Sequence, residues 1–103
     1  MLRHIVMWKF RPGTEAERDL FLAGLQGLYG AIPELKSCQV LRGIEGSDYD
    51  AVLISEFADR AALETYKNDP RHKAVSALCK SIRTDRAAVD CLLPDPEEYG
   101  KNA

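Results

Sequence analysis

The sequence predicts one α+β domain, in which helices cover one face of a four-stranded antiparallel sheet. Its 103 residues fit a single domain near the commonest domain size. Four segments alternate in the period of two that is typical of strands, and three others repeat apolar side chains at helical spacing. The hydrophobic share of 46% is ordinary for a globular protein and excludes an intrinsically disordered chain.

The chain opens with a predicted strand over residues 2–10. Alternation places one set of side chains on one face, Leu2, His4, Val6, Trp8 and Phe10, and another set on the opposite face, Arg3, Ile5, Met7 and Lys9. A turn at Arg11-Pro12-Gly13 ends the strand. Thr14-Glu15-Ala16-Glu17 then has the form of a capping box, which predicts a helix that runs to about Tyr29. Gly24 and Gly27 weaken this helix, and their small size favours close packing on the sheet over room for a ligand.

The remaining elements follow similar patterns. Strands are predicted over residues 36–42 and 51–57, and a short helix over 60–68 is capped by Asp59. Asp69 is a good N-cap and Pro70 a good first helical residue, so a third helix is predicted from Pro70 to about Ile82. The last strand is predicted over residues 87–93, the domain over 1–94, and a polar tail over 95–103. The order β-α-β-β-α-α-β is a split βαβ, ferredoxin-like arrangement with an extra helix.

One face of the predicted sheet has no helix to cover it. Its apolar residues are Ile5, Met7, Leu41, Val52, Ile54 and Leu92. An open apolar area of this extent is larger than monomers usually expose. We therefore expect a homodimer in which two sheets pack face to face about a two-fold axis, with His4 and Trp8 on the helix side of each sheet.

Charge and hydropathy exclude several classes of protein. The net charge of −2 is dispersed, so the chain lacks the clustered basic face of a nucleic-acid-binding protein. No apolar run approaches the ~20 residues of a membrane span, and the first residues lack the apolar core of a signal peptide. We therefore expect a cytoplasmic protein that has neither nucleic acid nor membrane as a partner.

The cysteines and histidines do not indicate a metal site. Cys38, Cys79 and Cys91 are widely spaced, and we interpret them as small buried hydrophobic groups, with a redox or nucleophilic cysteine as the alternative. His4 and His72 lack an obvious third ligand. We therefore predict neither a metal nor a cofactor, with haem ligation by one of the histidines as the alternative.

The segment from Tyr66 to Val75 contains a candidate acid–base pair. His72 lies in the first turn of the helix that begins at Pro70, where the positive end of the helix dipole disfavours a charged imidazolium. Tyr66 lies on the last turn of the preceding helix, and a bend at Asp69-Pro70 would bring the phenol and the imidazole toward one space. A neutral imidazole can accept a proton or a hydrogen bond, which general base catalysis requires.

Several motifs resemble those of the stress-responsive dimeric α/β-barrel (Dabb) domain. They are Arg3-His4-Ile5-Val6-Met7-Trp8-Lys9-Phe10-Arg11-Pro12-Gly13, Asp48-Tyr49-Asp50-Ala51, Tyr66 with Asp69-Pro70-Arg71-His72-Lys73-Ala74-Val75, and Val89-Asp90-Cys91, which has Cys in place of the family's aromatic residue. The resemblance spans about residues 2–93. It implies a ferredoxin-like monomer whose sheet forms a barrel with that of its partner.

A distantly similar member of that family is the plant olivetolic acid cyclase, which closes a linear polyketide by an aldol condensation without a cofactor. The resemblance implies that His72 would abstract a proton alpha to a carbonyl, while Tyr66 would hydrogen-bond the developing oxyanion. His4 would orient the substrate. A pocket for an apolar or aromatic ligand would have as its walls Val6, Trp8, Phe21 and Leu25.

Each candidate residue also has a purely structural interpretation. His72 can fix the helix start, Tyr66 can be a half-buried core aromatic, and His4 can be a buried, paired side chain. We interpret as solvated surface the basic residues Arg42, Arg71, Lys73 and Arg83. Two function classes remain. A stress-associated homodimer that binds a small hydrophobic ligand without turnover is favoured, and a cofactor-free polyketide cyclase or lyase is the alternative.

Overall fold

The computed structural model describes residues 1–94, and the predicted tail over residues 95–103 lies outside the described residues. The elements are β1 (Leu2–Phe10), α1 (Glu15–Gly27), β2 (Ser37–Arg42), β3 (Ala51–Phe57), α2 (Arg60–Asn68), α3 (Pro70–Ile82) and β4 (Arg83–Leu92). Their order is the predicted one. The sheet has the strand order β2-β3-β1-β4, and every neighbouring pair is antiparallel. The ferredoxin-like α+β fold is therefore confirmed.

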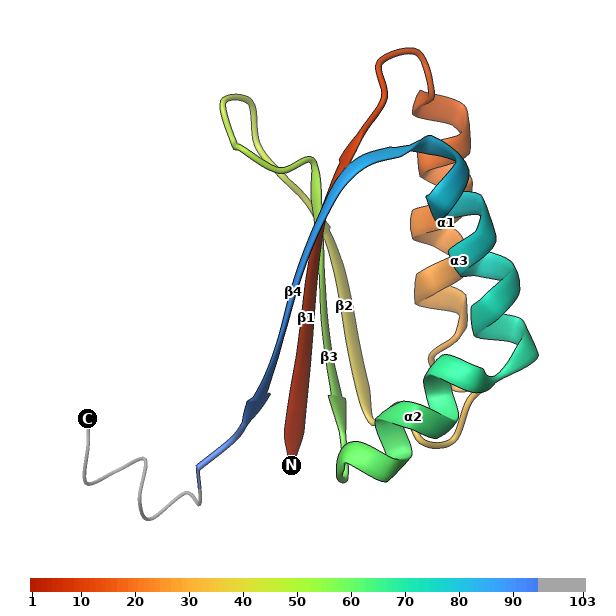
Figure 1. The fold of residues 1–103 in the computed structure, drawn as a ribbon, viewed down its shortest axis with the longest axis vertical. Coiled ribbons are helices and arrows are strands. Elements are labelled where there is room, and N and C mark those ends of the chain that lie inside the picture. Colours follow the sequence, from red (N-terminus) through yellow and green to blue (C-terminus); the bar gives the residue numbers. More distant parts are fainter. Residues whose placement is uncertain (95–103) are drawn as a thin grey trace.

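The helices lie on one face of the sheet, with α1 and α3 side by side and α2 near one end (Figure 1). This face carries the core, because Leu2, Val6 and Trp8 of β1 are buried there with Leu53 and Phe57 of β3. The predicted parity of β1 is confirmed, and it places His4 on the helix side together with Trp8. The first strand is thus central in the sheet and contributes a buried imidazole to an otherwise apolar layer.

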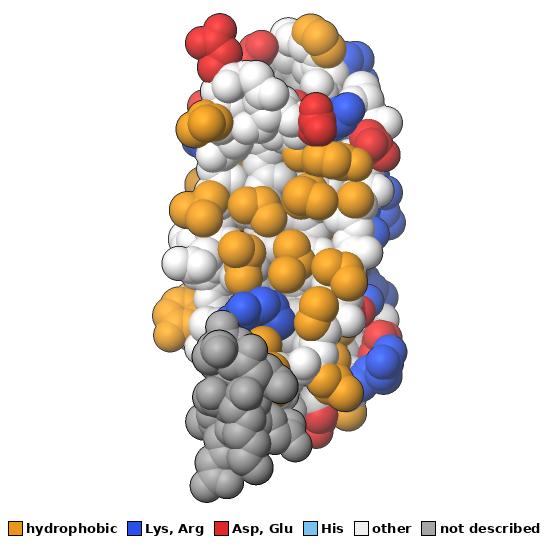
Figure 2. All heavy atoms as spheres, turned by 90° about the vertical axis from the view of Figure 1, so that its left-hand side faces the viewer, with side chains coloured by type: hydrophobic (Ala, Val, Ile, Leu, Met, Phe, Trp, Pro, Cys, Tyr) orange, Lys and Arg blue, Asp and Glu red, His pale blue; other side chains and the backbone are white. Residues whose placement is uncertain are grey.

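The opposite face of the sheet is open, and Figure 2 shows hydrophobic side chains gathered over it. Ile5 pairs with Ile54 and with Val89, and Met7 pairs with Val52, so these side chains share the open face. Val89 is 52% exposed and Leu41 is 49% exposed. The placement of Leu92 on this face is wrong, because Leu92 pairs with buried Leu2 and so has the parity of the helix side.

The glycines of α1 differ in their surroundings. A Cβ on Gly24 would lie 3.2 Å from Cγ2 of Val75 on α3, so Gly24 permits close packing against a helix rather than against the sheet. A Cβ on Gly27 would meet nothing within 4 Å. The packing interpretation therefore applies to Gly24 alone.

Some element boundaries differ from the predicted ones. The helix α1 ends at Gly27 rather than near Tyr29. The capping box is wrong, because the Thr14 hydroxyl donates to the Arg11 carbonyl and makes no cap hydrogen bond to α1. The strand β4 begins at Arg83, four residues before the predicted start at residue 87. Its first residues are polar and show no apolar alternation, but they pair with the end of β1.

The predicted caps of the other two helices are confirmed. The Asp59 carboxylate accepts a hydrogen bond from the Ala62 backbone N–H at the start of α2. The Asp69 carboxylate accepts one from the Arg71 N–H at the start of α3, where Pro70 is the first helical residue. The Arg71 guanidinium also donates to Asp69, and these bonds lower the pKa of the carboxyl group to about 2. The bend between α2 and α3 is therefore fixed by one residue that serves both helices.

Candidate functional site

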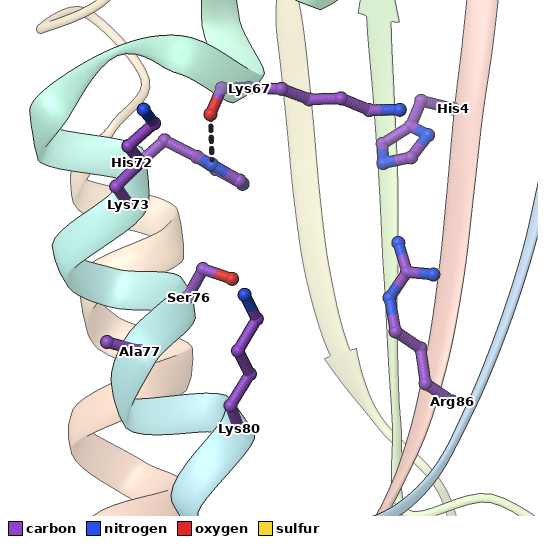
Figure 3. A pocket seen from close by; sticks show the side chains of 8 residues that line it. All are labelled: His4, Lys67, His72, Lys73, Ser76, Ala77, Lys80 and Arg86. Atoms are coloured by element: carbon purple, nitrogen blue, oxygen red, sulfur yellow. Dashed lines mark hydrogen bonds between the residues drawn. The ribbon is translucent and has the colours of Figure 1, made fainter.

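A cavity of about 480 Å³ lies between the helix-side surfaces of β1 and β4 and the helices α2 and α3. It is lined by His4, Lys67, His72, Lys73, Ser76, Ala77, Lys80 and Arg86. Figure 3 shows these residues on the four elements, with the side chains of Lys67 and Arg86 reaching toward His4. A smaller inner recess of about 60 Å³ adjoins it and shares His4, His72, Ser76 and Arg86 with it. The recess combines apolar side chains of the core with polar groups, namely both imidazoles, Ser76, Arg83 and Arg86.

The predicted pocket walls gather in the inner recess. The recess is lined by Val6, Trp8, Phe21, Leu25, Leu53 and Cys79 in addition to the shared residues and Arg83. The rings of Trp8 and Phe21 pack edge to face, with centroids 5.0 Å apart. Its volume corresponds to about two water molecules, so the recess accepts only a small apolar group.

His4 is held by the last strand. Its Nδ1 lies 2.5 Å from Oδ1 of Asp90, its cross-strand partner on β4. Because a carboxylate only accepts hydrogen bonds, Nδ1 carries the proton and Nε2 of the neutral ring is an acceptor. Burial lowers the pKa of this imidazole, Asp90 opposes the shift, and the charges of Lys67 and Arg86 add to the lowering. His4 is therefore a neutral, oriented imidazole at the base of the cavity.

His72 has the same tautomer for a different reason. Its Nδ1 lies 3.2 Å from the Lys67 carbonyl at the end of α2, and a carbonyl can only accept, so Nδ1 donates. Nε2 is then the basic nitrogen. Burial is the main cause that lowers the pKa of His72, which agrees in direction with the predicted neutral ring. The two histidines thus present unprotonated Nε2 atoms on side chains that line the same cavity.

Tyr66 and His72 come together as the bend at Asp69-Pro70 predicted. Their ring centroids are 4.5 Å apart, and the centroids of the Phe57 and Tyr66 rings are 5.0 Å apart. The Tyr66 side chain is only 1% exposed, its hydroxyl makes no hydrogen bond to residues 1–94, and burial raises its pKa well above the ordinary value. The residues that line the cavity and the recess do not include Tyr66. In this structure the Tyr66 ring packs against the His72 imidazole without lining the cavity. A contact between the Tyr66 hydroxyl and a ligand stays a prediction.

Several cavity residues were absent from the sequence-based site. The cavity is also lined by Lys67, Lys73, Lys80 and Arg86, and the recess by Arg83. Lys73 is exposed, as the interpretation of a solvated surface predicted, whereas Arg83 is only partly exposed and lines the recess. The other two basic residues do form surface ion pairs, Arg42 with Asp19 and Arg71 with Asp69. A signal existed in α3, where Lys73, Ser76 and Lys80 repeat at helical spacing beside His72.

The cysteines occupy three different environments. Cys79 is buried and Cys38 half-buried, and burial raises the pKa of both thiols, that of Cys79 to about 11. Cys91 is exposed, so its interpretation as a buried group is wrong. Within residues 1–94 no three His, Cys, Asp or Glu side chains cluster as metal ligands, and no helix there is long and apolar enough to cross a membrane.

The family follows from a comparison over nearly the whole chain. The Stress responsive A/B Barrel Domain, Dabb, matches residues 2–92. This chain belongs to the Dabb family. A relative from Streptomyces coelicolor, the uncharacterized protein SCO4036, is 30% identical over 89 residues, which are 82% of this chain and 92% of the relative. The resemblance seen in the sequence motifs is therefore confirmed.

Solved structures with the same fold include both uncharacterised proteins and an enzyme. A Dabb protein from Mesorhizobium loti is 26% identical with a TM-score of 0.76, covering 91% of this chain and 97% of that one. A dimeric ferredoxin-like protein from Thermobifida fusca is 25% identical with a TM-score of 0.80, covering 89% and 90%. Hydroxynitrile lyase from Passiflora edulis has a TM-score of 0.80 and covers 91% and 94%, but its 14% identity shows the fold alone.

Proposed function

We propose that this Dabb protein is a homodimer that binds a small organic ligand in the cavity between β1, β4, α2 and α3. The observation that carries the proposal is the meeting of two oriented imidazoles, buried His4 and half-buried His72, at a recess that also has apolar walls. Here each ring uses Nδ1 within the protein and leaves Nε2 for a ligand.

The dimer part of the proposal is based on the open sheet face. Ile5, Met7, Val52 and Ile54 form a contiguous group there through cross-strand pairing, and exposed Val89 extends it. Apolar area of this kind is removed from water when a second sheet packs on it. The dimeric description of the Thermobifida fusca neighbour supports this arrangement.

The ligand-binding part can be measured through Trp8, the single tryptophan of the chain, which lines the inner recess. Titration with acetophenone, a neutral aromatic carbonyl compound, is expected to quench Trp8 fluorescence saturably and to raise the melting temperature. Ser76→Phe fills the junction of cavity and recess, so it should abolish both effects. Ala74→Phe adds a ring on the exposed side of the same helix and should leave both unchanged. Equal behaviour of the two variants would contradict binding in this cavity.

A second candidate function is a cofactor-free lyase or cyclase, and the two Nε2 acceptors favour it. Burial lowers the pKa of both imidazoles from the ordinary value, so each ring is unprotonated at neutral pH and can abstract a proton alpha to a carbonyl. His72 would be the base, with His4 orienting the substrate carbonyl. The fold is compatible with lyase chemistry, since the hydroxynitrile lyase of Passiflora edulis has the same fold.

Proton abstraction can be tested without knowing the natural substrate. Exchange of the alpha protons of pentane-2,4-dione with deuterium, followed by NMR, should be faster with the protein than with buffer alone. His72→Gln should remove the acceleration, while Lys36→Gln, an exposed residue outside the cavity, should retain it. An acceleration that survives in His72→Gln would exclude His72 as the base.

A further inference from the structure

We propose that the ligand of this cavity is an anion, a small molecule whose carboxylate or phosphate group lies among Lys67, Lys80 and Arg86 while its apolar end points to the recess. This inference rests on the proposed ligand-binding function and names the chemistry of the ligand. The basis is the charge of the cavity wall. Four of its eight lining residues are Lys or Arg, and none of those eight is Asp or Glu. The whole chain, by contrast, has a net charge of −2.

Within the described residues, the cations of the cavity lack close carboxylate partners, as do several exposed basic side chains elsewhere, so what distinguishes them is that they line one space. Arg3, Arg42 and Arg71 each form an ion pair at 3.0 Å or less with a carboxylate. Among residues 1–94, Lys73, Lys80 and Arg86 have no carboxylate within 4.0 Å, and Lys67 only reaches Glu64 at 4.0 Å. The carboxylate of Asp90 accepts a hydrogen bond from His4 and is not among the residues that line the cavity. The cavity lining therefore carries more positive than negative charge.

The cations also converge from separate elements, which a solvated helix face would not require. Lys67 comes from α2, Lys80 from α3 and Arg86 from β4, and Figure 3 shows their side chains directed into the space in front of His4. Arg86 faces inward because it pairs with buried Trp8 in the register of β1 and β4. Bringing like charges together costs free energy, and a bound anion would offset it with charge-assisted hydrogen bonds.

The volumes of the cavity and the recess indicate the size and shape of the ligand beyond its anionic group. A carboxylate attached to an aromatic ring fits a cavity of about 480 Å³ with room to spare, and the adjoining 60 Å³ recess suits a small apolar substituent. Ser76, His4 and His72 line both spaces, so a carbonyl or hydroxyl group of the ligand would meet them where the cavity joins the recess. The structure thus points to a polar-headed aromatic or short-chain acid rather than a purely hydrophobic ligand.

Three matched probes test this inference, namely benzoate, phenyl phosphate and neutral benzamide, each titrated against the intact protein by Trp8 fluorescence. At least one anion should bind about tenfold more tightly than benzamide, and its Kd should rise with salt concentration. Which anion binds more tightly distinguishes a carboxylate from a phosphate ligand. Lys80→Gln and Arg86→Gln should each weaken the anion about fivefold or more and leave benzamide unchanged. Lys36→Gln, which removes an exposed charge outside the cavity, should leave all three affinities unchanged.

The possible failures are distinguishable. If benzamide binds as tightly as both anions, or if Lys80→Gln and Arg86→Gln leave anion affinity unchanged in folded protein, the anion inference is wrong and the ligand-binding function stands. Circular dichroism and melting temperature establish that each variant is folded. If none of the three probes binds at millimolar concentration but acetophenone does, the anion inference is wrong and the ligand-binding function stands. If acetophenone also fails to bind, both are overturned.

Discussion

Nδ1 of His4 lies 2.5 Å from Oδ1 of Asp90, so the first and last strands of the domain are joined at the base of the cavity. The two residues are 86 positions apart in the chain and become neighbours only through the register of β1 and β4. The pair fixes the tautomer of His4 and the direction of its ring. The pair thereby adds a side-chain link between edge strand β4 and the buried face of β1.

Replacing this carboxylate should change the pKa of one histidine and not the other. Asp90→Asn removes the charge and the strong acceptor that oppose the effect of burial, so the pKa of His4 should fall further below its value in the wild type. NMR titration of the two imidazoles measures both values, and His72 should be unchanged. Asp85→Asn, whose carboxylate pairs with Tyr49 on the surface, is the matched control. An unaltered His4 titration in Asp90→Asn would show that the pair does not persist in solution.

The hydroxyl of Tyr66 should be dispensable for stability. It is buried and makes no hydrogen bond to residues 1–94, so Tyr66→Phe removes a desolvated polar atom while keeping the ring on His72 and Phe57. We expect the free energy of unfolding to stay the same or to rise by about 1 kcal/mol in urea denaturation. A loss of more than about 1 kcal/mol would mean that the hydroxyl has a partner in the native state. If the same variant loses the acceleration of deuterium exchange, the hydroxyl reaches the reacting carbonyl after all.

The two glycines of α1 should respond oppositely to enlargement. Gly27→Ala adds a methyl group in open space and should raise the free energy of unfolding by up to about 1 kcal/mol, less if the helix end frays. Gly24→Val places branched carbon atoms against Val75, where a Cβ alone already approaches to 3.2 Å, and should destabilise by about 1–3 kcal/mol. Urea denaturation of both variants, with Gly27→Val as the control for valine's lower helix propensity, separates packing from propensity. Similar losses in Gly24→Val and Gly27→Val would contradict the close contact of α1 with α3.

Stability should fall as the pH drops below about 6.5, the ordinary pKa of histidine. The folded pKa values of His4 and His72 are both lowered by burial, so the unfolded chain binds protons first and protonation favours unfolding. The loss begins near pH 6.5 and continues until the folded pKa values are reached. Asp69, with its pKa lowered to about 2, contributes a loss only below about pH 4. Urea denaturation at pH 7.5 and 5.5 should show the decline, and His72→Gln should reduce it. An undiminished decline in His72→Gln would assign the effect to other groups.

The fold could be predicted from the sequence because each helix and strand is encoded by a pattern of neighbouring residues. The alternation of β1 set the inward position of His4 and Trp8, and the Asp69-Pro70 cap set the bend that brings Tyr66 to His72. The basic wall of the cavity was not predictable in the same way. Arg86 belongs to a polar start of β4 that has no apolar alternation, and its inward direction depends on a register with Trp8. Asp90 as the partner of His4 depends on the same long-range pairing.

The remaining prediction concerns the open face of the sheet. Ile54→Lys places a charge at the centre of the apolar group on that face, facing Ile5 across the strand pair, and should convert a dimer into a monomer at micromolar concentration. Leu20→Lys is the control, because Leu20 is 67% exposed on α1 and far from the sheet surface. Light scattering coupled to size-exclusion chromatography should give twice the chain mass for wild type and Leu20→Lys and a single chain mass for Ile54→Lys. Since lysine on an exposed strand surface costs a monomer little, a folded Ile54→Lys monomer would show that the face is an interface and no part of the chain's own core. A wild-type protein that runs as a stable monomer at micromolar concentration would contradict the sheet-to-sheet dimer.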